Sequence, residues 1–284
     1  MFALCYTPPM ERTSPHSPVT SKENKTVKFL ASLADPRDRK KEKAFLIEGV
    51  KMVEEALRDK LGVKQVIAAP SLTQHHGKGV LKLAERKGVN VLWISERMMD
   101  HVAESKTPQP VMAVVEMREH SEEELLAHGS KLIVLCHQLQ DPGNLGTIIR
   151  TAEAFSASGV AVTPHTVDAY NGKAVRGSMG SILRVPVVKV QSEHAFVRSC
   201  KERGFQTVAL VLNGRETPFE LDLTAPTVIM LGQESSGVMA EELADFDRRI
   251  RIPMAETIDS LNVATSAAVV LYEAMRQRMK PGKP

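Results

Sequence analysis

Three stretches of this chain place polar side chains and glycines directly after apolar, strand-like segments, and the first runs from Gln140 to Phe155. Its Asp-Pro-Gly sequence predicts a tight turn at Asp141, and Asn144 is a favourable N-terminal cap for the helix that follows. Apolar residues then recur at helical spacing, which directs Arg150 away from the buried side. A guanidinium in that position is a candidate functional group, although most single arginines on helices are simply solvated.

The second stretch is LGQESSG, from Leu231 to Gly237, which follows the apolar segment TVIM. Gly232 would let a ligand approach the backbone closely, and Glu234 supplies a carboxylate at the end of the strand. The stretch lacks the Lys-Ser/Thr ending of a phosphate-binding P-loop, and the chain contains no GxGxxG sequence. These features disfavour a mononucleotide or classical dinucleotide site, and a structural turn with a capping glutamate is the simpler alternative.

The third stretch, IRIPMAETIDSLNVATSAAVVLYEAM from Ile250 to Met275, joins a basic strand to a helix with one apolar face. Ser260 lies where the N-terminal cap of this helix is expected, and Asn262 adds a second polar side chain in the first turn. Such a helix end, with free backbone N–H groups beside two polar side chains, can hold a ligand. A simple cap at Ser260 and a core position for Met254 are the structural alternatives.

All three stretches follow strands, and a parallel sheet brings the carboxyl ends of its strands to one edge. Ligands of open parallel sheets bind beyond that edge. Three such loops with glycine or proline and polar groups are therefore expected to form one ligand site. The residue types alone do not name the substrate.

Strand-like and helical segments alternate twice along the chain, which predicts two α/β domains. We place a small one at residues 27–117 and a larger one, which carries the three stretches, at residues 131–284. The charged segment 118–130 is the expected linker, and residues 1–26, rich in Pro, Ser, Thr and Lys, are predicted to be a flexible tail. Because the strands of the second domain are apolar without alternation, its sheet is expected to be mostly parallel.

The net charge of the 284-residue chain is +3, which is too small to indicate a polyanionic partner by itself. Eight basic and four acidic residues lie between Lys22 and Lys43, however, and concentrate positive charge in the N-terminal part. The three cysteines are far apart and form no CxxC pair, and the nine histidines show no HxxxH or HExxH spacing. A disulfide framework and a metal site are therefore not expected, and a cytoplasmic setting fits best.

No apolar run approaches the length that spans a membrane, and the apolar segment Phe2–Tyr6 is too short for the core of a signal sequence. Neither membrane insertion nor export is expected from these features.

Taken together, three motifs resemble those of SpoU-type (TrmH-like) RNA ribose 2′-O-methyltransferases of the SPOUT superfamily. They are NLGTIIR with its preceding DPG, LGQESSG, and IPMAETIDSLNVATSAAVVLYE, in that order and spacing. The likeness covers residues 131–279, and FLIEGVKMVEEAL is similar to the RNA-binding substrate domain of the same family, a ribosomal-protein-like α/β unit. The resemblance implies a trefoil-knotted α/β catalytic domain, bound S-adenosylmethionine and an obligate homodimer.

The resemblance also assigns residues by position. The substrate and catalytic motifs would contain Asn144, Arg150, Glu234, Ser260 and Asn262. The cofactor would lie against the backbone around Gly232, Ile252, Met254 and Leu261, and RNA phosphates would contact Arg37, Arg39, Lys40, Lys41 and Lys43 of the basic loop 35–43. The family often has glycine in the turn after IPM, where this chain has Glu256.

Methyl transfer from a sulfonium to a ribose hydroxyl is an in-line displacement that depends mainly on positioning. A guanidinium stays protonated and is a poor general base, so Arg150 is expected to bind the target phosphate and stabilise developing negative charge. By resemblance to the family, the two-domain layout favours ribosomal RNA over transfer RNA as the substrate. The alternatives are a transfer-RNA methyltransferase, a non-catalytic RNA-binding or ribosome-assembly protein, and a small-molecule nucleotide enzyme.

Overall fold

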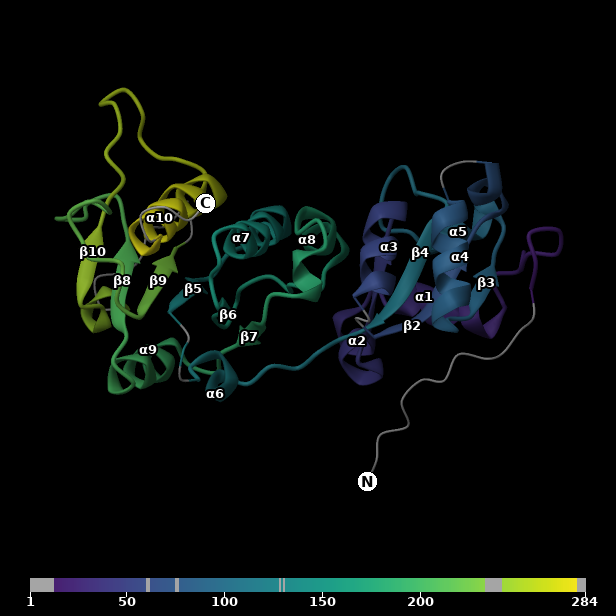
Figure 1. The fold of residues 1–284 in the computed structure, drawn as a ribbon, viewed down its shortest axis with the longest axis horizontal. Helices are drawn as coiled ribbons and strands as arrows, with labels where there is room; N and C mark the ends of the chain where they lie inside the picture. The colour runs from purple at the N-terminus through teal and green to yellow at the C-terminus, as the bar shows by residue number, and fades with distance from the viewer. Residues whose placement is uncertain are drawn as a thin grey trace. The chain divides into compact units, whose positions relative to one another are not determined.

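The structure is a computed structural model that describes residues 13–59, 62–74, 77–127, 129, 131–232 and 242–279 (Figure 1). Contacts between Cα atoms divide the chain into two compact units. The first unit comprises Met1–Arg118 and Tyr170–Leu183, and the second comprises Glu119–Ala169 and Arg184–Pro284. The first unit thus includes a segment from the middle of the chain, which the sequence had placed in the second domain.

The first unit is built on a four-stranded mixed sheet in the order β1-β4-β2-β3. Its strands are β1 (Ala44–Glu48), β2 (Val63–Ala68), β3 (Val91–Trp93) and β4 (Val111–Glu116). Strand β4 runs antiparallel to both neighbours, whereas β2 and β3 are parallel. The helices are α1 (Lys25–Ser32), α2 (Pro36–Glu42), α3 (Val50–Arg58), α4 (Lys78–Lys87), α5 (Glu96–Val102) and α8 (Gly172–Gly177), with 3-10 turns η1 (Pro70–Gln74) and η2 (Ser181–Leu183).

The described part of the predicted N-terminal tail is attached to this sheet. The backbone N–H of Val19 donates to Trp93 O at 2.9 Å, and Ser95 N–H donates to Val19 O at the same distance. The N–H of Trp93 also donates to Thr13 Oγ1 at 2.7 Å. The prediction of a flexible tail is therefore wrong for residues 13–26, because the edge of β3 offers backbone partners that composition does not reveal. Residues 1–12 lie outside the described ranges.

The basic segment 35–43 was predicted to be a loop, but most of it forms α2. Asp35 caps the helix by accepting a hydrogen bond from Arg37 N–H at 2.7 Å, and Pro36 occupies the first helical position. Lys43 ends the helix in a left-handed conformation with φ of 46°. An Asp-Pro pair is a recognised helix start, so the signal was present in the sequence.

The second unit contains a six-stranded sheet in the order β10-β8-β9-β5-β6-β7, with every neighbouring pair parallel. This confirms the expected mostly parallel sheet. The strands are β5 (Leu132–Cys136), β6 (Gly159–Val162), β7 (Val187–Lys189), β8 (Gln206–Leu210), β9 (Thr227–Leu231) and β10 (Arg248–Ile250). Figure 1 shows α7 (Pro142–Ala154) and α10 (Val263–Arg278) on one face, and α6 (Glu122–Leu125) and α9 (Glu193–Glu202) on the other.

The segment predicted as a linker contributes to the core of the second unit. Ser121 and Glu124 form a reciprocal capping box that starts α6. Leu125 and Leu126, which are 2% and 4% exposed, pack in one cluster with Phe196 of α9. The S-x-x-E sequence predicts the start of this helix. The two leucines that follow it pack in the core and hold the helix against the sheet.

The two described cysteines are buried and unpaired by disulfides. Burial raises the pKa of Cys136 to about 12 and, as the main cause, also raises the pKa of Cys200 to about 12. Neither thiol is therefore a ready nucleophile. Within the part of the chain that the structure describes, no helix has the length and hydropathy needed to cross a bilayer, and no group of three His, Cys, Asp or Glu residues could ligate a metal.

Candidate active site

Helices α7 and α10 lie side by side and begin together. At their N-terminal ends, Asn262 Nδ2 donates a hydrogen bond to Asn144 Oδ1 at 3.0 Å. Further along, the rings of Phe155 and Tyr272 meet edge to face with centroids 5.8 Å apart. Contacts at both ends show that the helices run in the same direction, so the first and third predicted stretches converge.

The first turn of α7 differs from the sequence prediction in its capping residue. Asp141, not Asn144, is the N-terminal cap, and it accepts a hydrogen bond from Asn144 N–H at 3.0 Å. Pro142 fits the first helical position because its missing N–H would be unpaired there anyway. The shift leaves the Asn144 amide free of a capping role and able to bind Asn262. Arg150 is exposed on the same helix, as its spacing predicted.

The start of α10 also moves relative to the prediction. Asn262 caps this helix, with Oδ1 accepting from Ala264 N–H at 2.9 Å and Thr265 N–H at 3.4 Å. Ser260 is exposed and lies two residues before the cap, so its predicted capping role is wrong. An asparagine amide both accepts and donates, which lets Asn262 cap one helix while it binds the other.

Four residues predicted to hold the cofactor follow the carboxyl ends of β9 and β10 or precede α10. Each is half-buried: Gly232, Ile252, Met254 and Leu261. Among the described residues, no backbone hydrogen bond uses the N–H of any of the four. Partly buried apolar side chains beside backbone donors without a described partner are typical of a small-molecule site. Glu234, predicted at the same site, lies outside the described ranges, as do Ser235 and Ser236.

One pair near these loops was missed by sequence reasoning. His137, the residue directly after β5, contacts Glu193 at the start of α9, with 2.5 Å between His137 Nδ1 and Glu193 Oε2. The backbone N–H of His137 donates to Leu231 O at 2.9 Å, beside Gly232. The two side chains are 56 positions apart in the sequence, and no spacing rule connects them.

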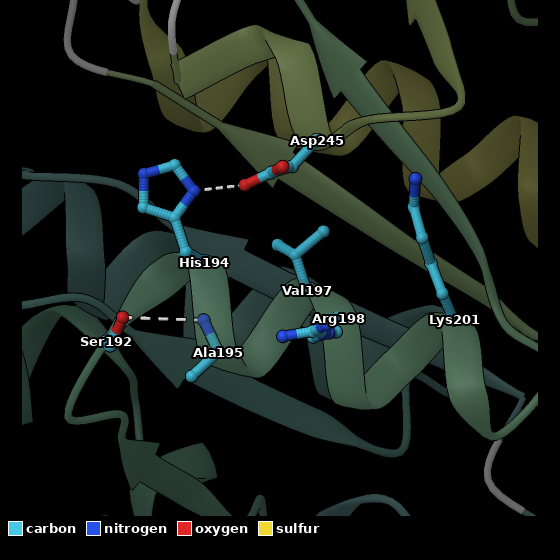
Figure 2. A pocket seen from close by; sticks show the side chains of 7 residues that line it. All are labelled: Ser192, His194, Ala195, Val197, Arg198, Lys201 and Asp245. Carbon is cyan, nitrogen blue, oxygen red and sulfur yellow. Dashed lines mark hydrogen bonds and ion pairs between the residues drawn. The ribbon is translucent and has the colours of Figure 1, made fainter.

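A surface pocket of about 540 Å³ lies elsewhere in the second unit, between α9 and the 3-10 helix η3 (Glu242–Asp245), as Figure 2 shows. Basic side chains of His194, Arg198 and Lys201 line it, and each forms an ion pair with a carboxylate. Its seven lining residues include none of those predicted for the site. With its charges already paired, this pocket offers little to an ionic substrate.

The predicted RNA contacts on α2 separate into two kinds. Arg37, Lys40, Lys41 and Lys43 are exposed. Arg39 is only 2% exposed and donates from Nη1 to two carbonyls at the end of α1, Leu33 O at 2.7 Å and Ala34 O at 2.8 Å. Arg39 is therefore a structural residue, and its prediction as an RNA contact is wrong.

Comparison with known families adds to this geometry. A model of the SpoU rRNA Methylase family matches residues 131–272, half of the chain, and a model of an MRM3-like substrate binding domain matches residues 24–113. The chain belongs to the SpoU rRNA methylase family. The resemblance drawn from the three motifs is thereby confirmed.

Members of the SpoU family that resemble this chain span nearly all of it. The 23S rRNA (guanosine(2553)-2′-O)-methyltransferase RlmP of Bacillus subtilis is 33% identical over 89% of this chain and 97% of its own length. The 23S rRNA (uridine(2479)-2′-O)-methyltransferase of Streptomyces viridochromogenes is 29% identical over 95% of both chains.

Among solved structures of the family, the AdoMet-bound rRNA methyltransferase from Sinorhizobium meliloti superposes with a TM-score of 0.78 and 32% identity. The match covers 92% of this chain and 98% of the other. The α/β fold with its mostly parallel sheet is therefore shared with this rRNA methyltransferase.

Proposed function

We propose that this SpoU-family protein is an S-adenosylmethionine-dependent RNA methyltransferase that methylates a ribose 2′-hydroxyl in 23S-type ribosomal RNA. The observation that carries the proposal is the convergence of Asn144 and Asn262 at the carboxyl edge of the parallel sheet. The similar proteins from Bacillus subtilis and Streptomyces viridochromogenes, which match nearly the whole chain, are named as 23S rRNA 2′-O-methyltransferases. Ribosomal RNA as substrate also supports a cytoplasmic location.

The cofactor would be held by the loops after β9 and β10. Gly232, Ile252, Met254 and Leu261 combine partial burial with backbone N–H groups that bind no described residue, which suits an adenosine and an amino-acid group. The solved relative from Sinorhizobium meliloti is described as AdoMet-bound. When bound, S-adenosylmethionine supplies the electrophilic methyl group.

The residues of α7 and α10 would orient the nucleotide. Asn144 and Asn262, fixed by their mutual hydrogen bond, can present amide groups to the ribose, and Ser260 offers an exposed hydroxyl nearby in the chain. Arg150 would bind the phosphate of the target nucleotide and stabilise negative charge on the 2′-oxygen as the displacement proceeds. Glu234 belongs to this proposed set through the motif alone.

The domain roles belong to the same proposal. Residues 27–117 would bind RNA, with Arg37, Lys40, Lys41 and Lys43 contacting phosphates, and residues 131–284 would be the catalytic domain. A match to a substrate binding domain over residues 24–113 supports the first assignment.

The trefoil knot and the homodimer are also proposals, and they rest on family membership. Val269 and Tyr272, which are 41% and 52% exposed on α10, support a surface that a second copy could cover. No metal ion is required by this mechanism, because positioning and charge stabilisation supply the catalysis.

Labelled methyl transfer tests the proposal. The purified protein is incubated with methyl-labelled S-adenosylmethionine and, in separate reactions, 23S rRNA, 16S rRNA and tRNA from a strain that lacks the gene. Incorporation into 23S rRNA is expected. Incorporation only into tRNA would show that the substrate is tRNA instead of 23S rRNA. RNA binding without incorporation into any of the three RNAs would identify a non-catalytic RNA-binding protein.

A further inference from the structure

The contact between His137 and Glu193 is a buried ionisable pair in a place that the proposed mechanism does not use. The His137 side chain is 5% exposed and the Glu193 side chain 15% exposed. Removing a carboxylate and an imidazole from water costs free energy. A buried pair of this kind therefore indicates that the contact has a structural or functional role.

Glu193 lies at the N-terminal end of α9. Ser192 caps α9 and Glu193 is the first residue of this ten-residue helix, where backbone N–H groups and the helix dipole stabilise negative charge. The contact joins His137 Nδ1 and Glu193 Oε2, so it uses only one of the two carboxyl oxygens. The second oxygen, Glu193 Oε1, is buried and has no hydrogen-bond partner among the described residues. A pair optimised for stability alone would not leave that oxygen unsatisfied.

The backbone of His137 is hydrogen-bonded to a strand end at the candidate site. Its backbone N–H donates a hydrogen bond to Leu231 O at 2.9 Å. This bond joins the carboxyl ends of β5 and β9, which we call the exits of the two strands, immediately before Gly232. The next residue, Gln138, has φ of 50° and donates its N–H to Thr163 Oγ1 at 3.0 Å, where β6 ends. The chain thus leaves the sheet in a constrained conformation, and the side chain of His137 contacts Glu193 of α9.

We infer that His137 and Glu193 are positioning residues, whose contact fixes the exits of β5 and β9 and thereby the backbone that binds the cofactor. The role is indirect, because the pair itself is enclosed by the protein. The inference rests on the proposed function for the identity of the ligand, but not for the effect on the two strand exits.

The same helix supplies a matched control. His194, the neighbour of Glu193, forms an ion pair with Asp245, and this contact is visible in Figure 2. The two side chains are 68% and 42% exposed, and they line the surface pocket rather than the strand exits. A His194→Ala variant therefore removes an exposed histidine–carboxylate pair from the same helix that carries Glu193.

The decisive variant replaces both members of the buried pair, His137→Leu with Glu193→Leu. Exchanging a buried ion pair for apolar residues of similar size commonly leaves stability unchanged or raised, so the fold is expected to survive. The dissociation constant for S-adenosylmethionine, measured by calorimetry well below the unfolding temperature, is expected to rise about tenfold. Glu193→Gln keeps a hydrogen-bond acceptor for His137 and is expected to stay within about threefold of the wild type, as is His194→Ala.

Hydrogen exchange gives a second measurement that needs no ligand. Amides in the peptides covering 137–144 and 229–232 are expected to exchange faster in the double leucine variant than in the wild type or His194→Ala, while the rest of the second unit is unchanged. If the double variant does not fold, Glu193→Ala is measured in the same way. Wild-type affinity together with wild-type exchange, or a uniform increase of exchange over the whole unit, would overturn the inference. Failure of the wild-type protein to bind S-adenosylmethionine would contradict the proposed function instead, and exchange would still decide the positioning role.

Discussion

Asn262 joins two helices with one side chain: its Oδ1 accepts from Ala264 N–H at 2.9 Å, and its Nδ2 donates to Asn144 Oδ1 at 3.0 Å. The same amide therefore fixes where α10 begins and how that beginning lies against α7. Two of the three predicted stretches depend on this contact for their relative position.

The two roles of Asn262 can be separated by substitution. Serine is a good cap but too short to reach Asn144, so Asn262→Ser is expected to keep the stability of the protein, whereas Asn262→Ala should lose about 1 kcal/mol. Both variants should lose about tenfold or more in the methyl-transfer rate, since each removes the bond between the helices. Urea unfolding and single-turnover transfer measure the two effects, and a serine variant with the wild-type rate would contradict the positioning role.

Arg150 is exposed, so its removal should leave the fold intact and act on chemistry alone. Arg150→Ala is expected to lower the transfer rate about 100-fold, on the order of 3 kcal/mol of barrier, because a positive charge at the developing alkoxide is lost. Binding of S-adenosylmethionine, followed by calorimetry, should not change. Arg198→Ala on α9 is the matched control, and equal effects of the two substitutions would remove Arg150 from the mechanism.

Exposed lysines on α2 should contribute to RNA affinity through phosphates. Replacing Lys40 and Lys41 by alanine is expected to reduce the slope of log affinity against log salt concentration by about 1 to 2, since roughly one counterion is released per phosphate contact. Lys82 and Arg86, exposed on α4 of the same unit, form the control pair with the same loss of charge. An identical change of slope in both double variants would indicate a general charge effect instead of a binding surface.

Arg39 should behave differently from its basic neighbours. Its guanidinium satisfies Leu33 O and Ala34 O, so Arg39→Ala is expected to lower the free energy of unfolding by about 2 kcal/mol through the loss of charge-assisted hydrogen bonds. The salt dependence of RNA binding by the folded variant should equal that of the wild type. A reduced slope with full stability would restore Arg39 as an RNA contact.

Asp247 gives the second unit a defined acid sensitivity. Burial raises the pKa of this carboxyl, but its ion pair with Lys201 and hydrogen bonds from Thr207 lower it by more, so the pKa lies below its ordinary value of 3.8. A carboxyl with a lowered pKa in the folded state stabilises the protein above its ordinary value and loses this contribution as pH falls through the lower one.

Asp247→Asn should therefore be less stable than the wild type at neutral pH. The difference in unfolding free energy should shrink as pH falls below about 4, where the wild-type carboxyl becomes protonated. Urea unfolding across that range measures it, and a difference that is independent of pH would exclude the charge as its origin.

Sequence patterns predicted the alternation of strands and helices because most strands are short apolar runs bounded by polar or turn residues. The starts of α7 and α10 were harder. Asp141 and Asn144 are both cap-type residues, as are Ser260 and Asn262, and local preference cannot choose between them. The choice follows from the tertiary contact between Asn144 and Asn262, which no local pattern contains.

Two further features lay beyond sequence reasoning for a similar reason. Arg39 stands in a run of exposed basic residues, and its burial follows from the way α2 folds back on the carbonyls at the end of α1. The contact of His137 with Glu193 joins the end of one strand to a helix two strands later. Side chains of this kind are set by packing across the fold, whereas apolar periodicity reports only which face of an element is buried.

The position of the transferred methyl group tests the central proposal most directly. A 2′-O-methyl group blocks alkaline cleavage of the adjoining phosphodiester, because the 2′-hydroxyl is the nucleophile in that cleavage. Labelled 23S rRNA from the wild-type reaction should therefore release its label in an alkali-resistant dinucleotide, and the Arg150→Ala reaction should contain about 100-fold less of it after equal time. Label released as mononucleotides, or equal labelling by both proteins, would contradict ribose methylation at this site.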